Sequence, residues 1–165
     1  AEFSSVRDPG SASLVQAIGW QRPLPVMPDL AFSFEPCLPS TVVVRSQADG
    51  MTIGVNLMPV HDPRWWPDAE PLSHARYRGA MARFVAHLLE RGHRVELFGT
   101  QPADEWIAGD LMRDLGAEAG NPRLSMTTTR TLDQLVQLYA RCDIITATRF
   151  HGIIIALRLA RPVLG

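Results

Sequence analysis

The chain has 165 residues, a length that suits one α/β domain or one domain with part of a second. Hydrophobic residues make up 46% and charged residues 20%, so the chain can bury a globular core without disulfide bonds. The formal net charge of −1 excludes the basic excess typical of a nucleic-acid binder, and we expect no nucleic-acid partner.

The cysteines and apolar residues indicate the compartment. Cys37 and Cys142 do not have the spacing of a metal-ligand motif, and two cysteines in a chain of this length are not typical of a secreted scaffold. No apolar run approaches the roughly 20 residues that cross a bilayer. The first ten residues lack the basic and apolar regions of a signal peptide. We therefore expect a cytoplasmic protein.

Short elements are predicted near the start of the chain. Residues 4–8 are typical of the end of a strand. Asp8 or Ser11 can cap a helix that follows, and Gly19 suits the end of that helix. Residues 25–34 indicate a short strand and its exit.

Segment 35–51, rich in proline and polar residues, is predicted to be a linker with an edge strand at 42–44. After it, apolar strands alternate with amphipathic helices. Strands are predicted at 51–57, 94–99, 123–129 and 143–148, helices at 75–91, 103–115, 131–142 and 151–160, and a last strand begins at Pro162. This alternation predicts right-handed crossovers and an α/β fold with a parallel sheet flanked by helices.

The turn after the fourth of these strands, Thr146–Gly152, is the strongest candidate for a ligand site, because ligands bind beyond the carboxyl ends of parallel strands. A helix beginning near His151 would present free backbone N–H groups to an anion, and Gly152 would let the backbone approach it. Arg149 offers a planar fork for a carboxylate or phosphate, and His151 can exchange a proton near neutral pH. Thr148 belongs to the same turn.

Two further polar residues end predicted strands and are weaker candidates. Arg7 ends the first strand, and Asn56 ends the first strand of the main domain. Each has a structural alternative, because Arg7 can pair with Asp8 at the surface and Asn56 can hydrogen-bond the loop backbone. The same is true of the main candidate, where Arg149 can pair with a surface carboxylate and His151 can cap a helix.

The other histidines do not form a metal-binding set, and we expect no metal ion. They are His61, His74, His87 and His93. His61 and His74 flank Trp65 and Trp66 in a loop predicted at 59–74, which either contacts a sugar by stacking or simply packs on the domain. The absence of Walker, GxGxxG, GxSxG and HExxH motifs argues against a P-loop enzyme, a typical dinucleotide dehydrogenase and a serine hydrolase.

Five segments along the chain form a characteristic series: SVRD at 5–8, PDLAF at 28–32, IGVNL at 53–57, RGHRVELFG at 91–99 and LYARCDIITATRFHGIIIALRLARPVLG at 138–165. With this series the chain resembles, over nearly its whole length, the polysaccharide pyruvyl transferase family. The last segment is the most specific, because family members typically have an arginine and a histidine separated by one residue where this chain has Arg149, Phe150 and His151.

The resemblance implies a GT-B-type enzyme with an active site between two Rossmann-like domains. It implies transfer of a pyruvyl group from phosphoenolpyruvate to two hydroxyls of a sugar, forming a ketal, without a cofactor. Arg7 would then be a donor-binding arginine, Arg149 would bind the donor's carboxylate or phosphate, and His151 would be the catalytic acid–base residue. The other expected substrate contacts are Asn56, Thr148 and Gly152.

The family also implies a domain organisation and partners. Residues 1–34 would be the tail of an N-terminal Rossmann-like domain, 35–51 a linker, and 52–165 a C-terminal Rossmann-like domain that lacks its end. Such a fragment need not be active alone. The expected partners are phosphoenolpyruvate and a glycan or lipid-linked saccharide of bacterial exopolysaccharide synthesis, and a lipid-linked acceptor would bring the protein to a membrane surface. A glycosyltransferase that uses a nucleotide sugar and a non-catalytic carbohydrate-binding relative stay open as alternatives.

Overall fold

The computed structural model describes residues 3–35 and 50–165. It divides the chain into two compact units, Ala1–Glu35 and Pro36–Gly165. The predicted edge strand at 42–44 and nearly all of the predicted linker lie outside the described residues.

The first unit contains a short capped helix, α1 (Pro9–Ala17). The Asp8 carboxylate caps it by accepting hydrogen bonds from the backbone N–H (2.7 Å) and the hydroxyl (2.8 Å) of Ser11. Gly19 follows the helix with a φ of +102°, a conformation that favours glycine. The cap and the end of this helix are therefore as the sequence predicts.

The strands predicted in the first unit are reduced to one pair of residues. Val6 and Val26 form a single parallel bridge. The prediction of strand and exit for residues 25–34 is partly wrong, because Leu30–Ser33 form a 3-10 helix, η1. Asp29 starts this helix by accepting a hydrogen bond from the backbone N–H of Ala31 at 2.9 Å, so local capping prevails over extension here.

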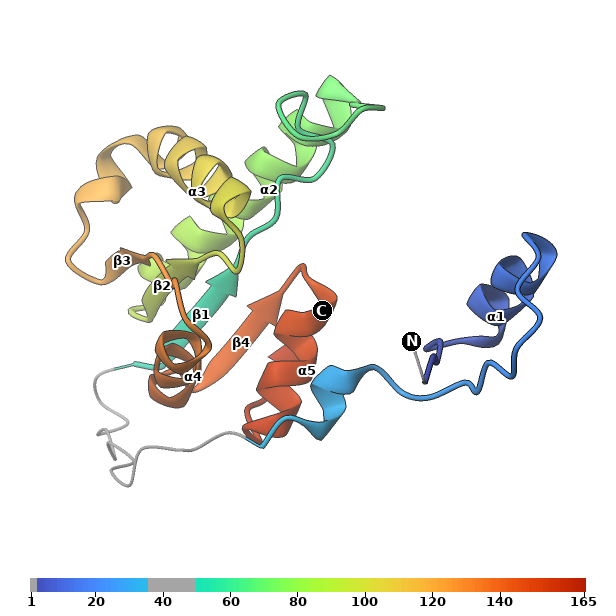
Figure 1. Cartoon of the computed structure of the whole chain (residues 1–165). Coiled ribbons are helices and arrows are strands. Elements are labelled where there is room, and N and C mark those ends of the chain that lie inside the picture. The colour runs from blue at the N-terminus through green and yellow to red at the C-terminus, as the bar shows by residue number, and fades with distance from the viewer. Residues whose placement is uncertain (1–2, 36–49) are drawn as a thin grey trace. The chain divides into compact units, whose positions relative to one another are not determined.

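The second unit is organised by a five-stranded parallel sheet with the order β3-β2-β1-β4-β5 (Figure 1). Its strands are β1 (Thr52–Asn56), β2 (Arg94–Phe98), β3 (Leu124–Thr127), β4 (Ile144–Ala147) and β5 (Val163–Leu164). All five predicted strands are present with bounds that agree to within two residues, which confirms the α/β fold. Every residue of β1 is buried, as a strand covered on both faces requires.

Helices cover both faces of this sheet (Figure 1). They are α2 (Pro71–Glu90), α3 (Pro102–Leu115), α4 (Leu132–Arg141) and α5 (Phe150–Arg158), with a 3-10 turn, η3 (Gly116–Gly120), after α3. On one face, buried apolar residues of α2 and α3 such as Val85 and Leu111 pack with Val55 and Leu97 of the strands. Each such side chain stabilises the fold by about 1.5–3 kcal/mol relative to exposure.

Three helices begin earlier than the sequence predicts, α3 by a single residue at Pro102. Helix α2 begins at Pro71, inside the loop predicted at 59–74, because proline at the first helical position has a suitable fixed φ. His74 is therefore a buried helical residue and not a loop residue. Helix α5 begins at Phe150, one residue before the predicted start. None of the helices in the described parts of the chain combines the length and apolar character that a membrane crossing requires.

Candidate active site

A pocket lies where the strand order of the sheet reverses. From β1 the chain moves outward to β2 and β3 and then returns to β4 on the other side of β1. Loops that leave such a switch point diverge and make room for a ligand. The pocket measures about 520 Å³ and is lined by Met58, Thr100, Gln101, Thr148, Arg149, Phe150 and His151. Three residues selected from the sequence, Thr148, Arg149 and His151, thus share one wall.

Asn56 is buried and holds the turn that carries these residues. Its side-chain oxygen accepts a hydrogen bond from the Arg149 N–H at 3.3 Å, and its Nδ2 donates to the Phe98 carbonyl at 3.4 Å. The Asn56 carbonyl accepts hydrogen bonds from the N–H (3.4 Å) and the hydroxyl (3.2 Å) of Thr148. Asn56 thus hydrogen-bonds the loop backbone, which is the structural alternative that the sequence allowed. A direct contact of Asn56 with a ligand stays a prediction.

Gly152 allows α5 to pack closely against β1 and β4. A Cβ atom at this position would lie 3.0 Å from Asn56 Oδ1, 3.1 Å from Ala147 Cβ and 3.3 Å from the Tyr139 hydroxyl oxygen. The Tyr139 hydroxyl also donates to the Gly152 carbonyl at 3.1 Å. The close approach at Gly152 is therefore to the protein's own strands, and its predicted contact with a ligand is untested.

Arg149 points its guanidinium at a buried carboxylate of α3. Its Nε donates to both carboxylate oxygens of Asp104, at 2.9 and 3.1 Å, and its Nη2 donates to Oδ1. The Asp104 side chain is fully buried, and that of Arg149 is only 15% exposed. Arg149 therefore pairs with a buried carboxylate and not with a surface one. Because the ion pair is bidentate, it fixes the position and plane of the guanidinium.

Asp104 was not singled out from the sequence. The carboxylate accepts hydrogen bonds from the N–H groups of Thr100 (2.8 Å) and Gln101 (3.0 Å). A Cβ on Gly99 would lie 2.4 Å from the Asp104 Cβ, so the glycine makes room for it. A glycine directly after a buried strand, followed by an acid in the next helix turn, was the available signal.

Arg149 keeps hydrogen-bonding capacity for a ligand. Its Nη1 forms no hydrogen bond with another described residue, and the side chain lies on the pocket wall. Backbone N–H groups and the amino end of α3 offset part of the Asp104 charge. The pocket wall therefore keeps an N–H donor for a ligand despite the ion pair.

His151 is the second residue of α5 and is exposed on the pocket wall. Its ring lies beside that of Phe150, with centroids 5.8 Å apart and planes at 71°. Because α5 begins at Phe150, the N–H groups of residues 150–152 have no acceptor in a preceding turn of the helix. The His151 imidazole thus stands at a helix end that favours anions.

Tyr77 of α2 contacts the same turn. Its hydroxyl lies 3.2 Å from Thr148 Oγ1 and accepts a hydrogen bond from the Met58 N–H at 3.3 Å. Burial raises the pKa of Tyr77, so the hydroxyl is protonated at neutral pH. The amphipathic pattern that predicts a helix at 75–91 carries no information about the contacts of this hydroxyl.

Arg7 lies in the first unit. Its guanidinium nitrogens are 3.9 Å from a carboxylate oxygen of Asp8 and 3.6 Å from one of Asp29. The Arg7 side chain is largely exposed, so these are surface pairs of low energy. Its predicted role in donor binding is not tested by these contacts.

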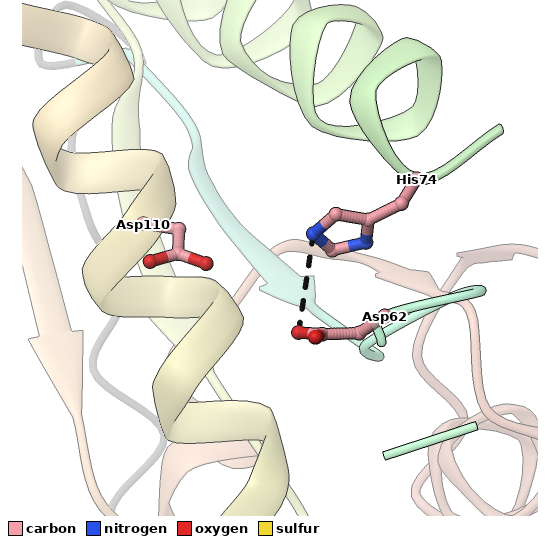
Figure 2. A group of neighbouring side chains, drawn as sticks. All are labelled: Asp62, His74 and Asp110. Carbon is pink, nitrogen blue, oxygen red and sulfur yellow. Dashed lines mark ion pairs between the residues drawn. The ribbon is translucent and has the colours of Figure 1, made fainter. Parts of the chain in front are cut away.

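A second polar cluster lies in the same unit, between the loop after β1, α2 and α3 (Figure 2). Potential metal-ligand atoms of Asp62, His74 and Asp110 all lie within 4.8 Å of one another. His74 Nδ1 is 2.9 Å from the Val60 carbonyl, and its Nε2 is 3.9 Å from Asp62 Oδ2. The sequence grouped the histidines only with one another and so missed this cluster.

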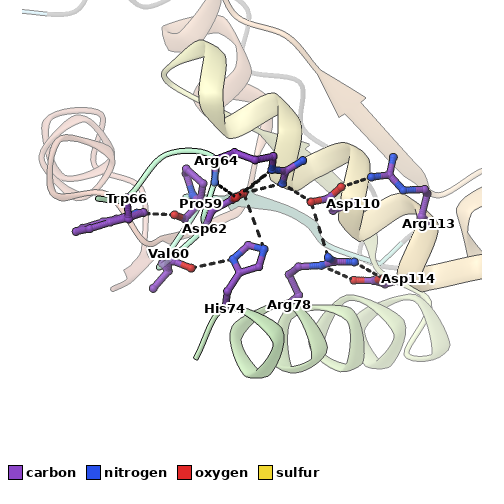
Figure 3. A network of polar contacts seen from close by, with 10 residues as sticks. All are labelled: Pro59, Val60, Asp62, Arg64, Trp66, His74, Arg78, Asp110, Arg113 and Asp114. Atoms are coloured by element: carbon purple, nitrogen blue, oxygen red, sulfur yellow. Dashed lines mark hydrogen bonds and ion pairs between the residues drawn. The ribbon is translucent and has the colours of Figure 1, made fainter. Parts of the chain in front are cut away.

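Arginines compensate the acidic charges of this cluster (Figure 3). Arg64 Nη2 lies 2.6 Å from Asp62 Oδ2 and 2.5 Å from Asp110 Oδ2. The hydrogen bonds from Arg64 hold the pKa of the Asp62 carboxyl below its usual value. Arg113 also pairs with Asp110, and Arg78 pairs with Asp114. The network needs no metal ion for charge balance and ties the loop to two helices.

Comparison with known proteins gives a family for the sequence. A family model described as polysaccharide pyruvyl transferase matches residues 1–165, which is the whole chain. No curated protein matches the sequence. The family match agrees with the resemblance seen in the sequence motifs.

Comparison with solved structures gives the fold. The chain is similar to Escherichia coli heptosyltransferase WaaC with ADP-2-deoxy-2-fluoro heptose, at 16% identity and a TM-score of 0.50, over 91% of this chain and 41% of that one. The structure of the same enzyme with ADP gives 18% identity and a TM-score of 0.47, over 91% and 40%. The chain spans about two fifths of these neighbours. The first likeness identifies a Rossmann-like half of a GT-B architecture.

Proposed function

Because the chain belongs to the polysaccharide pyruvyl transferase family, we propose that the protein transfers a pyruvyl group from phosphoenolpyruvate to two hydroxyls of a cell-surface polysaccharide or its precursor. One observation carries this proposal: a helix N-terminus, Arg149 and His151 meet at a single pocket of the sheet's switch point. The pocket therefore combines anion binding with proton exchange, and the reaction requires both.

The chemistry has an addition step followed by a displacement step. A sugar hydroxyl adds to C2 of the donor while C3 takes up a proton and becomes a methyl group. A second hydroxyl then forms the other C–O bond at C2 as the C–O bond to phosphate breaks, and its proton leaves with the phosphate. The products are a ketal and inorganic phosphate.

We assign the donor's anionic groups to Arg149 and to the first N–H groups of α5. A small donor with a carboxylate and a phosphate needs several charge-assisted donors, and a bidentate arginine next to a helix end supplies them. Asp104 is a positioning residue in this assignment, because it fixes the guanidinium plane. Thr148 lines the same wall and would contact the donor through its hydroxyl.

His151 is assigned the proton transfer. It is exposed on the pocket wall one residue after the start of α5, and general acid–base catalysis by a positioned histidine contributes about 10²–10⁴-fold.

Arg7 is assigned to the donor from the family pattern. The reaction needs no cofactor in this proposal, and we expect it in the cytoplasm, at a membrane surface when the acceptor is lipid-linked.

Release of inorganic phosphate tests the proposal. Full-length protein incubated with phosphoenolpyruvate and a saccharide acceptor should release phosphate, and His151→Ala and Arg149→Ala should each abolish the release. His87→Ala, in the last turn of α2, is the matched control and should keep full activity. Full activity of either pocket variant would overturn the assignment of the site.

The alternatives predict different products. Nucleoside diphosphate released from a sugar nucleotide, without consumption of phosphoenolpyruvate, would indicate the glycosyltransferase, a class to which the structural neighbour belongs. Saccharide binding without either product would indicate a non-catalytic relative.

A further inference from the structure

Two tryptophan rings lie together on the surface of the second unit. Trp65 is 50% exposed and Trp106 is 45% exposed. Their ring centroids are 6.3 Å apart, with planes at 77°. The Arg64 guanidinium carbon lies 5.8 Å from the Trp106 centroid. Adjacent half-exposed aromatic rings of this size are typical of a binding surface and unusual in a surface that only faces water.

The polar cluster of Figure 3 fixes the loop that carries Trp65. The N–H groups of Trp65 and Trp66 donate to the Asp62 carbonyl, at 2.9 and 2.8 Å, and the Trp66 indole N–H donates to the Pro59 carbonyl at 2.6 Å. Arg64 connects this loop to Asp110 of α3, which is four residues after Trp106 and on the same helix face. The loop therefore presents Trp65 in a fixed position beside Trp106.

Both rings belong to segments that leave the sheet at the edge where the pocket lies. Trp65 belongs to the loop after β1, which gives Met58 to the pocket. Trp106 follows Gln101, another pocket residue, by five positions, which is about 7.5 Å along a helix axis. A chain of two or three sugar residues can span such a distance.

We propose that Trp65 and Trp106 form a binding subsite for the saccharide acceptor, where they pack against a sugar residue near the one that receives the pyruvyl group. This inference rests on the proposed function. A pyranose ring has an apolar C–H face that packs on an indole and hydroxyls that bond at its rim. Neither indole N–H is bonded to another described residue, so both can donate to sugar hydroxyls.

The charges around the rings favour a neutral ligand. The Arg64 guanidinium, which lies beside the Trp106 ring, is already paired with Asp62 and Asp110. A phosphorylated ligand would therefore gain little binding free energy from the Arg64 guanidinium. An uncharged sugar ring does not depend on an unpaired cation for its binding free energy. This separates the subsite from the Arg149 pocket, which we assign to the anionic donor.

Saccharide binding measured without donor tests this subsite independently of catalysis. The probe is a set of oligosaccharides of two to six sugars, prepared by mild acid hydrolysis of the source organism's cell-surface polysaccharide, and binding to full-length protein is followed by calorimetry. Trp106→Ala and Trp65→Ala should each weaken binding by about tenfold, the size expected for loss of one aromatic contact. Leu157→Ala, an exposed apolar residue at the other end of α5, is the matched control.

The outcomes separate the two proposals. In steady-state assays the tryptophan variants should raise the acceptor KM about tenfold and leave the phosphoenolpyruvate KM unchanged. Wild-type binding by both variants, or no oligosaccharide binding by the wild-type protein, would overturn the subsite. Tighter binding of ADP than of any oligosaccharide, lost in Trp106→Ala, would overturn it in favour of a nucleobase platform. Phosphate release bears only on the proposed function, and melting temperatures of the variants check their folding.

Discussion

Asp104 and Asp110 lie on the same helix, are both buried and each bind an arginine, yet their surroundings differ. Asp104 binds one guanidinium, that of Arg149, whose Nη1 forms no hydrogen bond with another described residue and whose side chain lines a pocket. Asp110 accepts from Arg64 and Arg113 in a network where each carboxylate has a cation. A cluster of charged side chains does not by itself identify a ligand site. The pocket differs from the second cluster because one of its hydrogen-bond donors, Arg149 Nη1, has no acceptor among the described residues.

The comparison also suggests a division of labour along α3. Asp104, in the first turn, orients the residue assigned to the anionic donor. Asp110, further along, fixes the loop that carries one of the exposed indoles. One helix would thus position both substrates through two buried carboxylates on different faces.

The largest effect is expected for Asp104→Ala. Removal of the carboxylate leaves the mostly buried Arg149 cation without its partner and two backbone N–H groups without an acceptor, which costs about 3–5 kcal/mol of unfolding free energy. Urea denaturation measures this loss, and phosphate release should fall with it because the guanidinium is no longer oriented. An Asp104→Ala protein as stable and active as the wild type would contradict the positioning role.

Asp110→Ala should have a smaller effect on stability than Asp104→Ala. Its arginine partners are partly exposed and can regain water, so we expect a smaller loss of about 1–2 kcal/mol in the same denaturation experiment. The phosphoenolpyruvate KM should stay unchanged while the acceptor KM rises. A large increase in the phosphoenolpyruvate KM would mean that the two regions are not separate.

The smallest effect is the response of the second cluster to acid. The pKa of Asp62 is lowered in the folded protein, chiefly by hydrogen bonds from Arg64, so its stabilising contribution is complete above the unfolded value of about 4. The contribution is lost as pH falls through the lower folded pKa. Thermal melting of wild type and Asp62→Asn between pH 7 and 3 should therefore converge on acidification, and a constant difference across this range would contradict the assignment.

The sheet could be predicted well because the sequence patterns of strands and helices are local. A few adjacent residues are enough to indicate a buried strand such as Thr52–Asn56 or a helix that ends at a glycine. The predicted start of α2 is too late because the prolines of segment 59–74 indicate a loop, whereas Pro71 occupies the first helical position. The N-cap at Asp29 likewise converted a predicted strand exit into a 3-10 helix.

The site was only half predictable for a physical reason. Thr148, Arg149 and His151 are adjacent in sequence, so a single turn revealed them. Asp104 is 45 positions from Arg149, and Asp62 and Asp110 meet through Arg64 across a similar separation. Such partners are brought together by the crossover topology, and periodicity carries no information about them.

A crystal structure of the full-length protein with phosphoenolpyruvate would locate the donor-binding site. We expect the donor to occupy the pocket at the switch point, with an anionic group at the N–H groups of residues 150–152, another at Arg149, and the His151 ring within hydrogen-bond distance. A donor bound away from this pocket, or in it without contact to Arg149 and His151, would show that Arg149 and His151 do not form the donor site.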